Sequence, residues 1–130
     1  MAKQRVISIV DDDASVREAT ARLVRSLGYR AATFASAEEF LQSDRLHDSS
    51  CLISDLNMPG MTGADLQDRL IADGHRTPMI FMTAYFEENA RDRVLNAGAS
   101  GFLRKPFAEE TLVACLEKAL KEADSKPVKS

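Results

Sequence analysis

The sequence has no long apolar run, and this absence excludes a membrane-spanning segment. Residues 1–5 lead directly into the short run Val6–Val10, which is far shorter than the apolar region of a signal peptide or a membrane span. We therefore expect a soluble, cytoplasmic protein that makes no contact with a membrane.

The sequence also lacks an excess of basic residues over acidic ones. The 17 lysines and arginines are outnumbered by 20 acidic residues, the net charge is -3, and both signs are interspersed along the chain. Binding to a nucleic-acid backbone needs a basic stripe, which this pattern does not supply. We expect no direct nucleic-acid binding by this segment. A length of 130 residues suits one ordinary domain and is too short for two.

Cysteine and histidine are scarce. Cys51 and Cys115 each lie inside an apolar stretch, without the spacing of a metal site or a disulfide framework, and are predicted to be reduced and buried. His47 and His75 lie in loop-like stretches without companion ligands, and both are predicted to be surface histidines.

Short apolar runs alternate with longer stretches of helical periodicity, which is typical of β-α units that form a parallel sheet. The predicted strands are residues 6–10, 29–34, 51–54, 79–82 and 101–103. The second is more polar and is expected at a sheet edge. The predicted helices lie near residues 15–27, 36–41, 62–71, 87–97 and 112–119. We expect an α/β domain over residues 1–123, followed by a polar tail or the start of a linker at 124–130.

The first helix is predicted from two kinds of signal. Ser15 and Glu18 have the spacing of a capping box, while Asp13 alone has the usual character of an N-cap. The apolar stripe expected to face the core comprises Val16, Ala19, Leu23, Val24 and Leu27.

Polar residues follow four of the predicted strands. The first strand is followed by Asp11, Asp12 and Asp13, and the others end at Asp55, at Thr83 and just before Lys105. The carboxyl ends of parallel strands meet at one edge of a sheet, where ligands bind in such folds. Each residue alone has an ordinary structural explanation, as a cap, turn former, strand-end hydroxyl or surface charge. Their joint placement predicts one composite site.

Clustered carboxylates repel one another and favour a bound cation. Oxygen ligands suit a hard divalent ion, and Mg²⁺ commonly uses one or two carboxylates together with water and phosphate oxygens. A lysine and a hydroxyl are also expected beside the metal. Together with the carboxylates they indicate a phosphoryl-transfer site in which a carboxylate is the nucleophile.

Several segments resemble the receiver domain of two-component response regulators. The resemblance runs from Arg5 to about Glu122 and is carried by residues 9–13 (IVDDD), 55–63 (DLNMPGMTG), 83–84 (TA) and 105–107 (KPF). It implies a flavodoxin-like (βα)5 three-layer sandwich with a five-stranded parallel sheet in the order 2-1-3-4-5. It also implies a phosphoacceptor switch that promotes its own phosphorylation and dephosphorylation, rather than an enzyme.

The same resemblance implies roles for individual residues. Asp55 would take the phosphoryl group from a phosphohistidine of a sensor histidine kinase, with Thr83 and Lys105 assisting. Asp12 and Asp55 would bind Mg²⁺, Asp11 would act through water, and Asn57 would contribute its backbone carbonyl. The peptide bond between Lys105 and Pro106 would be cis. These assignments are implied by the resemblance alone.

Switching would follow from the new charge. Thr83 would move to the phosphoryl oxygens and Phe102 would swing into the vacated space, which changes the surface formed by the fourth helix, fifth strand and last helix. The partner of that surface would be a downstream effector domain or protein, and a phosphorylation-dependent homodimer is compatible with it. Phe102 stands where tyrosine is frequent in the family, and Tyr85 lies where the family varies. Residues 81–85 and 102–107 look like those of receivers that precede helix-turn-helix domains of the nitrogen-fixation-regulator type.

Two other functions stay open at this point. A hydrolase of the haloacid dehalogenase type also uses a strand-end aspartate with Mg²⁺, but its nucleophile belongs to a D-x-D-x-T pattern on the first strand, which residues 11–15 do not supply cleanly. A flavodoxin would need to bind a phosphate at an acidic edge that repels it. The cognate kinase, the output and the phosphoryl lifetime are not encoded in any pattern we recognise.

Overall fold

Five parallel strands form one sheet in the order β2-β1-β3-β4-β5, which confirms the predicted topology. The computed structural model describes residues 5–125. Its strands are β1 (Val6–Val10), β2 (Arg30–Phe34), β3 (Cys51–Asp55), β4 (Met79–Thr83) and β5 (Gly101–Arg104). Every residue of β1, β3 and β4 is buried, whereas the edge strand β2 is partly exposed, as its more polar sequence predicted.

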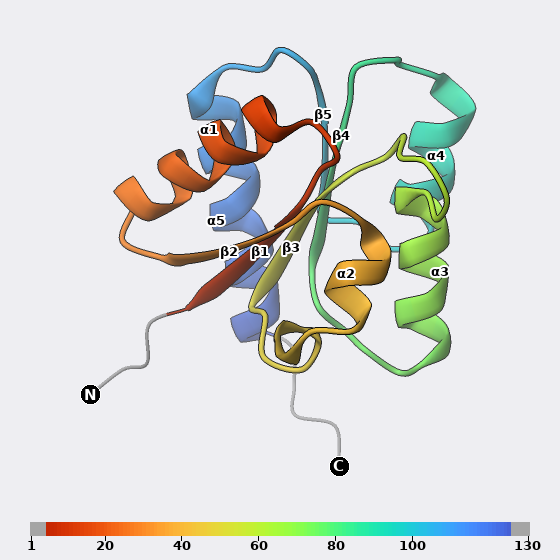
Figure 1. The fold of residues 1–130 in the computed structure, drawn as a ribbon, viewed down its shortest axis with the longest axis horizontal. Helices are drawn as coiled ribbons and strands as arrows, with labels where there is room; N and C mark the ends of the chain where they lie inside the picture. The colour runs from red at the N-terminus through yellow and green to blue at the C-terminus, as the bar shows by residue number, and fades with distance from the viewer. Residues whose placement is uncertain (1–4, 126–130) are drawn as a thin grey trace.

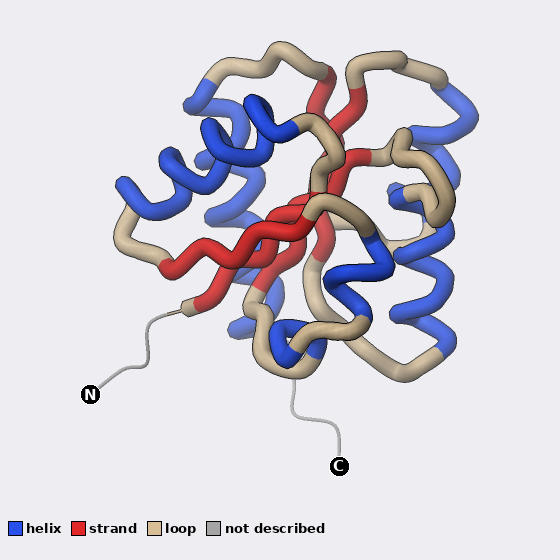
Figure 2. The backbone as a smooth tube through the Cα atoms, in the orientation of Figure 1, coloured by secondary structure: helices blue, strands red, loops and turns tan. Residues whose placement is uncertain are grey.

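Helices cover both faces of the sheet, giving three layers (Figures 1 and 2). They are α1 (Ala14–Ser26), α2 (Ala37–Leu41), α3 (Gly63–Ala72), α4 (Glu88–Asn96) and α5 (Glu109–Ser125), with a short 3₁₀ helix, η1 (Asp44–Leu46), after α2. Side chains of α1 and α5 pack with Ile7 and Ile9 on one face. Those of α2, α3 and α4 pack with Val10 and Leu52 on the other. Alternation along each strand thus divides the core into two halves.

The first helix differs from its prediction in two respects. Asp13 is the N-cap, as its residue type and position predicted, and its carboxylate accepts hydrogen bonds from the backbone N–H groups of Ser15 and Val16. The predicted capping box at Ser15 and Glu18 is therefore wrong, because the helix has already begun at Ala14. The predicted apolar stripe is also partly wrong. Thr20, Ala21 and Val24 face the sheet, whereas Ala19 and Leu27 are exposed.

The remaining predictions of local structure are mixed. Both cysteines are free; Cys51 is buried as predicted, but Cys115 is only half-buried. Its sulfur would lie 2.9 Å from a Cβ built on Gly101, so Cys115 packs beside a strand that has no side chain there. Helix α5 runs to Ser125, and residues 126–130 of the predicted tail lie outside the described residues, so the division at 123 stays a prediction. Within residues 5–125, no helix combines the length and apolarity that crossing a membrane needs.

Candidate functional site

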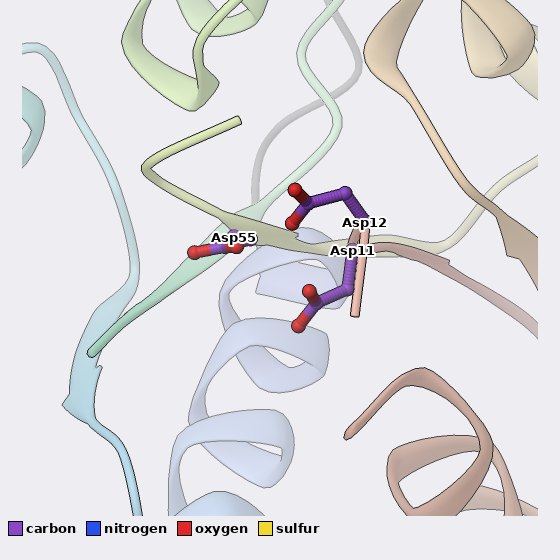
Figure 3. A group of neighbouring side chains, drawn as sticks. All are labelled: Asp11, Asp12 and Asp55. Atoms are coloured by element: carbon purple, nitrogen blue, oxygen red, sulfur yellow. The ribbon is translucent and has the colours of Figure 1, made fainter. Parts of the chain in front are cut away.

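Three carboxylates meet at the carboxyl ends of β1 and β3. Asp11 and Asp12 follow β1, Asp55 is the last residue of β3, and each offers an oxygen within 4.8 Å of the others (Figure 3). Asp11 and Asp55 are buried, and Asp12 is exposed. The parallel arrangement brings these residues together because neighbouring strands β1 and β3 end at the same edge. The three carboxylates of the predicted composite site therefore meet in one cluster.

Lys105 supplies the positive charge of this cluster. It follows β5, across the sheet from β1, and its Nζ donates a 2.9 Å hydrogen bond to Asp11 Oδ2 and lies 3.5 Å from Asp55 Oδ2. Only 13% of its side chain is exposed. The bond from Lys105 to Pro106 is cis, as the resemblance implied. The prediction of a lysine beside the acidic residues is therefore right about position, and the lysine is held by two carboxylates at once.

The carboxylates of the site differ in how they are engaged. Asp11 is engaged by two short hydrogen bonds, because its Oδ1 accepts from the backbone N–H of Asp13 and its Oδ2 from Lys105, both at 2.9 Å. Asp55 is held more loosely. Its Oδ1 accepts a 3.3 Å hydrogen bond from the backbone N–H of Asn57, and Oδ2 has only the 3.5 Å ion pair. Asp55 is thus the buried carboxylate with spare capacity to bind something else.

Electrostatics at Asp55 favour its neutral form. Burial, and after it the charge of Asp11, raise the pKa of Asp55 to about 6, although the charge of Lys105 opposes the rise. Burial alone would lower the pKa of Lys105, but its hydrogen bond to Asp11 and the charge of Asp55 leave that pKa raised. Burial and the neighbouring Asp11 together therefore outweigh the attraction between Asp55 and Lys105.

The cluster fits a hard divalent cation. Its donors are carboxylate oxygens, the ligand type that Mg²⁺ prefers, and a cation there would favour the ionised form of Asp55, which burial and the charge of Asp11 disfavour. No other group of three or more ligating His, Cys, Asp or Glu side chains occurs in the described part of the chain.

Thr83 stands at the end of β4 and is 1% exposed. Its Oγ1 accepts a 2.7 Å hydrogen bond from Asn57 Nδ2, accepts from Tyr85 N–H and can donate to the Tyr85 carbonyl, both at 3.1 Å. Sequence reasoning gave Asn57 a role only through its backbone. It missed the side-chain contact, because nothing in the sequence relates these two loops.

Phe102, on β5, is half-buried and its ring packs edge-on to Phe86, with ring centroids 6.1 Å apart. The guanidinium groups of Arg91 and Arg104 lie 5.3 and 4.6 Å from the centroid of the Phe86 ring. Sequence reasoning did not single out Phe86. The only sequence signal for Phe86 was its position three residues after Thr83. Its contact with Phe102 on β5 is visible only in the fold.

Helix α3 approaches Asp55 very closely. A Cβ added at Gly63 would lie 2.6 Å from the Asp55 carbonyl oxygen and 2.9 Å from Leu56 Cα, so only glycine fits there. The Gly63 N–H donates to the Leu56 carbonyl at 2.9 Å. Thr62 caps the helix in a capping box with Asp65. The first turn of α3 therefore fixes the backbone from which the Asp55 side chain projects.

Comparison with known proteins gives consistent matches. A family model described as the response regulator receiver domain matches residues 7–117. Response regulator protein TmoT of Ectopseudomonas mendocina is 41% identical over 93% of this chain and 55% of its own length. Transcriptional regulatory protein FixJ of Bradyrhizobium diazoefficiens is 32% identical over 91% of this chain and 58% of its own. The solved structure of response regulator StyR matches with a TM-score of 0.87 and 38% identity, over 94% of this chain and 62% of that one. The chain spans about half the length of the curated relatives it matches.

Proposed function

This chain belongs to the response regulator receiver domain family, whose members are phosphoacceptor switches of two-component systems, and we propose that Asp55 is its phosphoacceptor. The observation that carries the assignment is the unequal engagement of the two buried carboxylates. Both oxygens of Asp11 accept 2.9 Å hydrogen bonds, whereas Asp55 has one long hydrogen bond and one ion pair. Hydrogen bonds withdraw electron density from a carboxylate oxygen, so the more weakly engaged Asp55 is the better nucleophile of the two.

In the proposed reaction an oxygen of Asp55 attacks the phosphorus of a phosphohistidine on a sensor histidine kinase. The new O–P bond forms as the P–N bond breaks, and the kinase imidazole leaves, taking up a proton. The domain is in this proposal a phosphoacceptor and not an enzyme with turnover on a separate substrate. It promotes its own phosphorylation, and the later hydrolysis of the acyl phosphate, by positioning the same groups.

Metal and lysine divide the charge of the phosphoryl group. We assign Mg²⁺ to Asp12, Asp55 and the backbone carbonyl of Asn57, with Asp11 acting through water. When bound, Mg²⁺ neutralises carboxylate and phosphoryl oxygens. Lys105 already lies 3.5 Å from Asp55 Oδ2, so its ammonium can pair with a phosphoryl group on Asp55 after a small movement.

The proposed switch uses Thr83 and Phe102. The Thr83 hydroxyl has to leave its partners Asn57 and Tyr85 before it can donate to a phosphoryl oxygen. Phe102, half-buried against Phe86, then moves into the space and alters the face formed by α4, β5 and α5. A downstream effector domain or protein binds that face in the switched state. A second copy of the domain can also be the partner, which gives phosphorylation-dependent dimerisation. We place the domain in the cytoplasm, where it meets the kinase.

The two alternative functions are not supported by the comparisons. The family match covers residues 7–117 and is to receiver domains, with neither the hydrolase nor the flavodoxin family among the matches described above. The acidic edge, with Asp11, Asp12 and Asp55 around one small volume, also disfavours a flavin phosphate.

The decisive experiment is phosphorylation with a small acyl-phosphate donor in Mg²⁺, followed by intact mass. We expect a gain of one phosphoryl group, its loss in Asp55→Asn, and its loss on chelation of Mg²⁺. Asp13→Asn is the matched control, since Asn caps a helix as well as Asp and the residue is an exposed neighbour of the cluster. Modification that persists in Asp55→Asn and maps to another aspartate would overturn the assignment.

A further inference from the structure

The two histidines of the chain are in contact with each other. His47 follows η1 and His75 lies in the loop between α3 and β4, and their ring centroids are 5.5 Å apart with the rings tilted by 52°. Both loops lie at the lower end of the view in Figure 1, opposite the end where the carboxylates meet. The sequence predicted two separate surface histidines; His47 is exposed and His75 is half-buried, and their contact was not foreseen.

The imidazole nitrogens of this pair are not used elsewhere. Among the hydrogen bonds and ion pairs of residues 5–125, none involves the ring of His47 or His75. His47 is exposed and His75 is half-buried. His75 also borders a cavity of about 470 Å³ between the ends of α3, α4 and α5. The His75 ring, which has no hydrogen bond within the described residues, therefore stands next to space that water or a small ligand can fill.

The separation of the rings fits a shared metal ion. A metal–nitrogen bond of about 2.0–2.1 Å places the ion about 3.2 Å from each ring centroid, and a tetrahedral angle then sets the two centroids about 5 Å apart. The observed 5.5 Å is close to that value. We propose that His47 and His75 together bind one divalent transition-metal ion of the Zn²⁺, Ni²⁺ or Cu²⁺ class.

The chemistry of this site differs from that of the acidic cluster. Neutral imidazole suits Zn²⁺, Ni²⁺ and Cu²⁺, whereas Mg²⁺ prefers oxygen and keeps several waters. No third ligating side chain completes a cluster at the histidines in the described part of the chain, so water fills the remaining positions. Carboxylates nearby in the sequence, Asp48 and Asp73, form ion pairs with Arg45 and Arg69.

A metal here would join the loop that enters β3 to the loop that enters β4. These strands are neighbours in the sheet, and the Leu52 N–H donates to the Pro78 carbonyl at 2.9 Å where they begin. An ion that binds only the folded arrangement of both loops stabilises the folded state. The site is remote from the phosphoacceptor, and the proposal does not depend on the function of Asp55.

The experiment uses Ni²⁺ as probe, with excess Mg²⁺ and in the Asp12→Asn, Asp55→Asn background, so that the acidic cluster does not compete. The readout is backbone amide NMR at about pH 7.5, because protons compete with a metal for its ligands at lower pH. We expect paramagnetic broadening first at residues around 47 and 75, and at least tenfold weaker binding in His47→Gln and in His75→Gln. Asp48→Asn, which keeps both rings, should bind with little change.

Thermal unfolding gives a second readout in the wild-type background. With Mg²⁺ present, Zn²⁺ should raise the unfolding midpoint by a few degrees, and neither histidine variant should respond. The two variants remove the same site from different loops, so misfolding of one leaves the other informative. Broadening confined to residues near 11 and 55, or binding unchanged in both histidine variants, would show that the pair is not a metal site.

Discussion

Asn57 Nδ2 donates a 2.7 Å hydrogen bond to Thr83 Oγ1, linking the loop after the proposed phosphoacceptor to the proposed switch hydroxyl. The same hydroxyl is held by the backbone of Tyr85. Thr83 is therefore fixed away from Asp55 by three hydrogen bonds before any phosphoryl group arrives. The free energy needed to break these bonds sets part of the threshold for switching.

Removing the Asn57 amide should lower that threshold. In Asn57→Ala, Thr83 loses one partner worth about 1 kcal/mol, so the ratio of switched to unswitched protein at a fixed dose of a stable phosphoryl analogue should rise by roughly fivefold. The measurement is the population of the two states in NMR spectra of residues 83 and 102. Thr83→Ala is the control, and it should give no coupled change at Phe102. An unchanged ratio in Asn57→Ala would mean that the hydrogen bond does not resist switching.

The raised pKa of Asp55 predicts a pH-dependent cost of folding. A carboxyl whose pKa rises from 3.8 to about 6 on folding favours the protonated form, so its contribution to stability is full below about pH 4 and is lost as pH rises through 6. Without Mg²⁺, Asp55→Asn should therefore be more stable than the wild type by about 1–2 kcal/mol at pH 7, after allowance for solvent screening. Near pH 4 the two proteins should be equal. Urea unfolding at both pH values measures the difference.

Saturating Mg²⁺ provides the internal control for this prediction. A cation beside the carboxylates neutralises the charge that burial disfavours, so the advantage of Asp55→Asn at pH 7 should shrink or reverse. Asp13→Asn, at an exposed cap, should show no such dependence on pH or metal. An Asp55→Asn protein that is less stable than wild type at pH 7 in chelator would contradict the electrostatic explanation.

The close approach of α3 predicts a large effect at Gly63. In Gly63→Ala the added methyl meets the Asp55 carbonyl oxygen and Leu56 Cα, both backbone atoms that cannot rotate away, so the helix has to shift. We expect a loss of about 2–3 kcal/mol in urea unfolding and slower phosphorylation of Asp55. Gly74→Ala is the comparison, since its φ of 84° strains alanine but nothing lies within 4 Å. It should cost about 1 kcal/mol and leave phosphorylation unchanged.

The sequence was sufficient to predict those features that depend on position along one strand or helix. Alternating apolar runs predicted a parallel α/β sheet, and polar residues at strand ends predicted where the site lies. The strand order itself followed from the resemblance. Parallel strands end at the same edge of a sheet, so the positions of polar residues along the sequence were enough to predict where in the fold the site lies.

Features that depend on two loops meeting were not predictable in this way. Asn57 with Thr83, Phe86 with Arg104, and the two histidines each lie in or beside loops that flank neighbouring strands, and their contacts depend on the conformations of those loops. The face of α1 that meets the sheet was also misjudged. Helical periodicity identifies apolar residues but does not say which of two adjacent stripes faces the sheet, and Thr20 and Ala21 lie on the buried one.

Lys105 offers a test in which metal affinity and phosphorylation should change in opposite directions. Its ammonium pairs with Asp11 and Asp55 and repels any cation that the same carboxylates bind. In Lys105→Met the apparent affinity for Mg²⁺, measured by NMR titration or calorimetry, should rise by roughly tenfold, because one positive charge a few ångströms away is gone.

Phosphorylation of Lys105→Met by an acyl-phosphate donor should nevertheless be slower than in wild type at saturating Mg²⁺, because a cationic partner of the phosphoryl oxygens is missing. Lys118→Met is the matched control, since Lys118 pairs with Glu122 at 4.0 Å on the exposed side of α5. It should change neither quantity. Weaker Mg²⁺ binding in Lys105→Met with an intact fold would show that the lysine organises the carboxylates for the metal more than it repels the ion.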